Sequence, residues 1–163
     1  MRRFTWRCIV GEMVLLEDTR NKVGKHKNVQ AYCEKHGIEL VRVCLAVGDY
    51  MLPDGKISVD TKKDLSELAT NLLNPQDKKR FMREVRRARE AGIQLVVLCE
   101  HGGKIKTLTD VAQWESSYSP VKGRALVDAM HRLTVSYGVR FEFCQKRCTG
   151  KRIVEILEGR EVV

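Results

Sequence analysis

Short apolar runs and helically spaced apolar residues alternate along the chain, which is the pattern of an α/β protein. The run LVVLC within 94–99 has no polar interruption, as expected for a central strand that is buried on both faces. Similar arguments predict strands at 13–16, 39–47, 56–61 and 139–144, and helices at 28–36, 65–73, 76–91, 123–137 and 151–158. The pattern therefore predicts a mixed central sheet flanked by helices.

Turn and capping residues predict how some of these elements begin and pair. Asn28 stands where a helix N-cap is expected, because its side chain can accept a hydrogen bond from the first free amides. The Pro-Asp-Gly sequence at 53–55 is typical of a tight turn. We therefore expect the segments 39–47 and 56–61 to form a hairpin across it.

Composition indicates a single folded domain spanning 1–163. The chain has 163 residues, of which 43% are hydrophobic and 31% charged, so it can bury a core of its own. No run of 18 apolar residues occurs and the amino terminus is charged early, which predicts a cytoplasmic protein, nucleoid-associated if prokaryotic or phage. The six scattered cysteines are interpreted as reduced core thiols.

The net charge points to a polyanionic partner. Thirty Lys and Arg residues against twenty-one Asp and Glu give a net charge of +9. Such an excess favours association with nucleic acid, although a solvated basic surface would give the same count. A specific arrangement of residues is needed to decide between the two.

Acidic residues at predicted strand ends supply such an arrangement. Asp60 and Lys62 stand two residues apart in a strand, so their side chains project from the same face. A carboxylate there can bind a hard cation, while the ammonium orients or deprotonates a water molecule. Asp18 and Asp49 lie at or beside other strand ends. Together they predict phosphodiester hydrolysis with Mg²⁺ or Mn²⁺, although a lone Asp-x-Lys triplet often arises by chance.

These motifs, in this order, resemble the nuclease domain of the XPF-type structure-specific endonucleases, a PD-(D/E)xK family with a restriction-endonuclease-like fold. The family has an Asp-x-Arg-Glu signature, then Gly-Asp, then Glu-Arg-Lys followed by a later Asp. The chain carries matching segments over about 13–157: Asp18-Thr19-Arg20, Gly48-Asp49-Tyr50, Asp60-Thr61-Lys62, Arg80-Phe81 and Gly138-Val139-Arg140-Phe141.

The resemblance implies roles for individual residues. Asp49 and Asp60 are expected to bind the metal, with Asp18 assisting directly or through water, and Lys62 to position the attacking water. Arg20 is expected either to steady the scissile phosphate or to pair with a neighbouring carboxylate.

Arg80 is the best candidate on the basic helix at 76–91 for a contact with DNA, because the resemblance includes its position. The remaining basic residues of this helix are more simply explained as a solvated outer face.

The chain also departs from the family signature. Asp60 stands in place of its Glu, and three other positions differ: Asn21, Thr61 and Ser66 replace Glu, Arg and the trailing Asp. Asp64 and Glu67 lie near that last position, but their spacing is that of a helix capping box.

The resemblance predicts a metal-dependent DNA endonuclease that acts on branched or flapped DNA, with RNA left open. The chain is too short for the helix-hairpin-helix domain that usually targets family members to DNA, so a homodimer or a separate DNA-targeting protein is expected to help. A catalytically silent DNA-binding partner subunit is the alternative, because XPF-type nucleases pair with subunits that have lost their acids. A nucleotide-binding domain is disfavoured, because no Gly-rich phosphate loop occurs.

Overall fold

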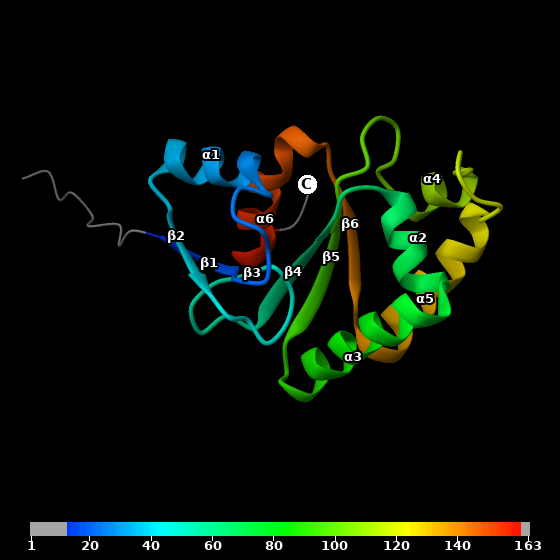
Figure 1. Ribbon diagram of the computed structural model, residues 1–163, viewed down its shortest axis with the longest axis horizontal. Coiled ribbons are helices and arrows are strands. Elements are labelled where there is room, and N and C mark those ends of the chain that lie inside the picture. Colours follow the sequence, from blue (N-terminus) through cyan, green and yellow to red (C-terminus); the bar gives the residue numbers. More distant parts are fainter. Residues whose placement is uncertain (1–12, 161–163) are drawn as a thin grey trace, which may run out of the picture.

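In the computed structural model, which describes residues 13–160, six strands form one mixed sheet with helices on both of its faces (Figure 1). The strand order is β2-β1-β3-β4-β5-β6, and only β3 runs antiparallel to its neighbours. This architecture confirms the predicted fold class. The strands are β1 (Val14–Asp18), β2 (Glu39–Val43), β3 (Tyr50–Met51), β4 (Ile57–Lys62), β5 (Gln94–Cys99) and β6 (Arg140–Phe143).

The helices cover the sheet in two groups, α1 and α6 on one face and α2, α3 and α5 on the other (Figure 1). No helix within residues 13–160 is long and apolar enough to cross a membrane. The helices are α1 (Lys27–His36), α2 (Leu65–Leu73), α3 (Pro75–Glu90), α4 (Leu108–Gln113), α5 (Gly123–Tyr137) and α6 (Thr149–Leu157), with a short 3₁₀ turn at Lys146–Cys148.

Strand β5 divides the core as its sequence predicts. Val96 packs into the cluster under α1 and α6, whereas Val97 packs into the cluster under α2, α3 and α5, and both are fully buried. Alternate residues of a strand point to opposite faces, so an uninterrupted apolar run is what two covered faces require. The strand lies between β4 and β6, one position from the edge, so it is internal but not the centre of the sheet.

The predicted hairpin between 39–47 and 56–61 is wrong. Strand β2 ends at Val43 and pairs in parallel with β1, because α1 carries the chain back between them. The antiparallel partner of β4 is the two-residue strand β3. The apolar residues Leu45 and Val47 are buried in the loop between β2 and β3, which explains why their pattern extended the predicted strand.

Two local predictions also differ from the structure. The N-cap of α1 is His26 and not Asn28. The side-chain amide of Asn28 donates instead to the carbonyl of Lys146 at 3.1 Å. Helix α4 was not predicted, because only Val111 of its six residues is buried and no apolar period is visible. A capping box between Thr107 and Asp110 begins this helix.

The five cysteines within residues 13–160 form no disulfide, but only some of them belong to the core. Cys33 and Cys99 are buried, as interpreted from the sequence, whereas Cys44 and Cys148 are exposed. Cys8 lies outside the described residues. The interpretation as core thiols is therefore wrong at these two positions: Cys44 directly follows the last residue of β2, and Cys148 lies in the 3₁₀ turn with no apolar neighbour in the sequence.

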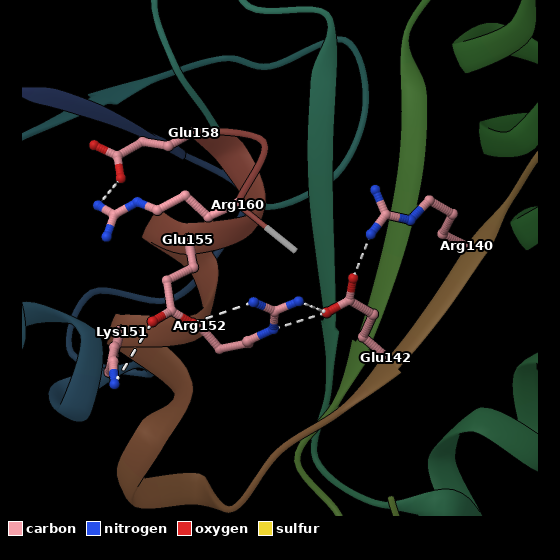
Figure 2. A network of polar contacts seen from close by, with 7 residues as sticks. All are labelled: Arg140, Glu142, Lys151, Arg152, Glu155, Glu158 and Arg160. Atoms are coloured by element: carbon pink, nitrogen blue, oxygen red, sulfur yellow. Dashed lines mark hydrogen bonds and ion pairs between the residues drawn. The ribbon is translucent and has the colours of Figure 1, made fainter. Parts of the chain in front are cut away.

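A network of charged residues joins β6 to α6 (Figure 2). The guanidinium of Arg152, which is 8% exposed, donates from Nε and Nη2 to Glu142 and from Nη1 to Glu155. Arg140 donates to the same Glu142 carboxylate at 2.6 Å. The network ties the helix that covers one face of the sheet to the strand at the sheet's edge.

Candidate active site

The predicted site residues meet at the carboxyl edge of the sheet. Asp18 is the last residue of β1, and Asp60 and Lys62 lie at the end of β4. Asp49 directly precedes β3, which starts at this same edge because it runs in the opposite direction. In α/β sheets with mostly parallel strands, this edge is where ligands usually bind.

The strand register places the three aspartates in one row. Tyr50 of β3 pairs with β1 on one side and with Val59 of β4 on the other, so the next step of both ladders aligns Asp18, Asp49 and Asp60. Two main-chain hydrogen bonds of 2.8 Å continue the row, from Asp18 N to Asp49 O and from Asp49 N to Val59 O. The structure thus brings together residues that are far apart in the sequence.

Asp60 and Lys62 form a buried ion pair at the end of β4. Lys62 Nζ lies 2.8 Å from Asp60 Oδ2, and the two residues are only 7% and 6% exposed. Burial raises the pKa of Asp60 to about 7, with Lys62 opposing this shift and Asp49 adding to it. Burial alone would lower the pKa of Lys62, but the Asp60 carboxylate more than offsets it, so Lys62 stays an ammonium.

Asp49 is held by neutral donors. Its Oδ2 accepts hydrogen bonds from Thr61 N at 2.8 Å and Thr61 Oγ1 at 2.6 Å, and its Oδ1 accepts one from Asn21 Nδ2 at 3.0 Å. Asn21 and Thr61 are two of the positions at which the chain departs from the family signature. From the sequence, these two residues are only departures from the signature. In the structure both donate hydrogen bonds to the Asp49 carboxylate and so orient it.

Asp18 is bound on both carboxylate oxygens. Its Oδ2 accepts a hydrogen bond from Arg20 Nε at 2.6 Å, and its Oδ1 accepts one from the backbone N–H of Leu45 at 3.1 Å. Arg20 also donates to the carbonyl of Leu45 at 2.8 Å, and its hydrogen bond with Asp18 raises the Arg20 pKa. Arg20 therefore pairs with a carboxylate, while its side chain stays 54% exposed.

The carboxylates fit a small divalent cation with few protein ligands. Within residues 13–160 no group of three or more His, Cys, Asp or Glu side chains has the arrangement of a metal site. In the same residues, Asp60 Oδ2 is buried and accepts no aligned hydrogen bond, the Lys62 contact being an ion pair. Mg²⁺ is commonly held by one or two carboxylates and several waters. Asp49 and Asp60 match that donor set.

Glu84 of α3 is a further acidic residue at the site that was not predicted from the sequence. Its Oε1 accepts a hydrogen bond from the backbone N–H of Gly48 at 2.7 Å. A signal was present, because Glu84 lies three residues after Phe81 and four before Ala88, both buried. It therefore lies at the border of the buried face of α3, not on its solvated side.

An open pocket of about 860 Å³ adjoins the row of aspartates at Thr61. Charged residues of both signs line it, the basic Lys25, His26, Lys63, Arg80 and Lys146 and the acidic Asp64, Glu67, Asp77 and Glu100. Arg80 is exposed and pairs with Asp77 at 3.0 Å, and both residues line the pocket. Arg80 therefore faces the pocket and not the row of aspartates at the sheet edge. Asp60 and Lys62 are not among the residues that line it.

Comparisons with known proteins show the family and the fold of the chain. The ERCC4 domain matches residues 18–155. The fold is similar to XPF from Aeropyrum pernix, with a TM-score of 0.65 and 21% identity over 89% of this chain and 63% of that one. XPF from Aeropyrum pernix in complex with DNA gives a TM-score of 0.67, 21% identity, and coverage of 90% and 64%. The chain thus spans less than two thirds of these proteins. No curated protein matches it significantly.

Proposed function

The chain belongs to the ERCC4 domain family of nucleases, and on this premise we propose that it is a divalent-metal-dependent DNA endonuclease. The observation that carries the proposal is the row of Asp18, Asp49 and Asp60 with the ammonium of Lys62 beside it. A buried ion pair such as Asp60–Lys62 adds little stability compared with apolar residues, so chemistry is the better explanation for it.

Each residue then has a role that its contacts support. Asp49 and Asp60 would hold the cation, and a bound Mg²⁺ or Mn²⁺ would supply polarisation of the phosphodiester and a lower pKa for a coordinated water. Lys62 is an ammonium, so it positions the attacking water and stabilises developing negative charge instead of accepting a proton. Asp18 orients Arg20, whose exposed guanidinium can contact the scissile phosphate.

The net charge of +9 supports a nucleic-acid substrate. The adjoining pocket offers Lys25, Lys63, Arg80 and Lys146 to a phosphate backbone, although as many acids line it. The solved structure with DNA belongs to a protein of similar fold. We propose branched or flapped DNA as the substrate, with targeting by a second copy or by a separate DNA-binding protein.

The test is cleavage of flapped, branched and linear oligonucleotides with Mn²⁺ or Mg²⁺. Asp49→Ala should abolish cleavage and weaken Mn²⁺ binding in calorimetry while the protein stays folded. Asp128→Ala is the matched control, because Asp128 is an exposed acid on α5. Equal cleavage by the wild type and Asp49→Ala would show that a contaminant is responsible.

A catalytically silent DNA-binding subunit is the second candidate. It is favoured by the low exposure of Asp60 and Lys62 and by their absence from the residues that line the open pocket. A wild-type protein that binds DNA, binds no Mn²⁺ and cleaves none of the substrates would establish this alternative.

A further inference from the structure

Helix α3 contacts the candidate active site at two points one turn apart. The ring of Phe81 lies 5.5 Å from Lys62 Nζ, and the carboxylate of Glu84 accepts the Gly48 N–H at 2.7 Å. The first contact covers the buried ion pair. The second joins the helix to the loop that leads into Asp49.

Gly48 is the residue at which the chain enters the row of aspartates. Its φ is +70°, and a Cβ at this position would lie 2.1 Å from Ser58 Oγ. Glycine is therefore required for both conformation and space. The next residue, Asp49, is held by backbone hydrogen bonds to β1 and β4, so these bonds and the Gly48–Glu84 hydrogen bond together fix the backbone that carries the Asp49 side chain.

We infer that Glu84 is a positioning residue, which fixes the Gly48 amide and through it the Asp49 carboxylate against Thr61. Its role in cleavage rests on the proposed function, whereas its effect on the turn does not. The donor is a backbone amide and the acceptor is a charged carboxylate, a combination that is stronger than a neutral hydrogen bond. The charge of Glu84 also adds to the shift that raises the pKa of Asp60.

Three variants separate the parts of this role. Glu84→Ala removes the acceptor, and Glu84→Gln keeps an acceptor oxygen without the charge. Glu84→Asp withdraws the carboxylate by one methylene and serves if Glu84→Ala does not fold. Glu90→Ala is the matched control, because Glu90 is an exposed acid on the same helix.

The first readout is amide hydrogen exchange at Gly48 and Thr61, measured without metal or DNA. Loss of a hydrogen bond to a charged group should speed exchange by about tenfold at both amides in Glu84→Ala. Glu84→Gln should stay within about threefold of the wild type, and Glu90→Ala should not differ. Unchanged exchange at Thr61 in Glu84→Ala, or in Glu84→Asp if that variant replaces it, would overturn the inference.

The second readout is Mn²⁺ affinity together with the kcat and KM of cleavage. Glu84→Ala should weaken Mn²⁺ binding by about tenfold and lower kcat, with KM for DNA little changed. Glu84→Gln should restore most of the Mn²⁺ affinity and most of kcat. If Glu84→Gln is as impaired as Glu84→Ala, the charge acts directly and the positioning role is wrong. If the wild type neither binds Mn²⁺ nor cleaves DNA, the proposed function fails, and the exchange measurements alone decide the inference.

Discussion

Replacing Glu142 with alanine should destabilise the protein by about 3 kcal/mol, because it leaves the buried guanidinium of Arg152 with one acidic partner. The Arg152 side chain is 9% exposed and that of Glu142 14%. Glu142 accepts two of the three hydrogen bonds that Arg152 donates to acids, the third going to Glu155 at 3.1 Å. Breaking a buried pair costs about 3 to 5 kcal/mol, and the retained Glu155 contact places Glu142→Ala at the lower end.

Urea unfolding followed by circular dichroism measures this loss. In a domain of this size, about 3 kcal/mol corresponds to a decrease in Tm of about 6 to 12 °C. The double variant Glu142→Leu, Arg152→Met should recover most of the stability, because no buried charge is left unpaired. Glu115→Ala is the control, since its pair with Lys122 spans 3.9 Å and is largely exposed, and it should cost under about 0.5 kcal/mol. A loss below about 1 kcal/mol in Glu142→Ala, or a double variant no more stable than the single one, would refute the reasoning.

Three further changes test other parts of the structure. Gly48→Ala should destabilise the protein by more than about 1 kcal/mol in urea unfolding, because its Cβ would lie 2.1 Å from Ser58 Oγ; a neutral result would contradict the turn geometry. Arg80→Ala should weaken DNA binding and reduce its salt dependence by about one phosphate contact in titrations, whereas equal salt slopes would remove Arg80 from the interface. Burial raises the pKa of Cys33 to about 11, so this thiol should resist alkylation at pH 8, whereas the exposed Cys44 should react; mass spectrometry of the modified peptides reports both.

Much of the fold could be predicted from the sequence where a pattern is long. Helices α2 and α5 and strand β5 have the predicted bounds, because each carries enough apolar residues to define its period. Strand β3 has only two residues, so no alternation of apolar and polar residues is visible in it. The sequence therefore predicted β2, and not β3, as the antiparallel partner of β4. Parallel pairing between β1 and β2 depends on how α1 packs against the sheet, and no local sequence pattern predicts that packing.

The sequence singles out the acids of the candidate site, but not the residues that hold them. Asp18, Asp49 and Asp60 stand at strand ends, and the register aligns them as the resemblance implied. The hydrogen bonds that hold Asp49 and its turn come from Asn21, Thr61 and Glu84 across sequence separations of 28, 12 and 36 residues. Such contacts are set by tertiary packing, and a single sequence carries no direct sign of them.

The pairing of charges at the site bears on the choice between an enzyme and a silent subunit. Asp18 is paired with Arg20, and Asp60 with Lys62. Among residues 13–160, Asp49 forms no ion pair within 4 Å and is held by neutral donors alone.

Glu84, too, has a neutral partner, because the group that donates to its carboxylate is the backbone amide of Gly48. Within residues 13–160, Asp49 and Glu84 thus leave about two negative charges without an ion pair within 4 Å, and a divalent cation would neutralise them. Asp49→Asn keeps an acceptor for Thr61 but removes one of these charges, so it should reduce Mn²⁺ affinity while leaving the melting temperature near that of the wild type. A silent DNA-binding subunit gains nothing from such an excess of negative charge, since it would repel the phosphate backbone that the subunit has to bind.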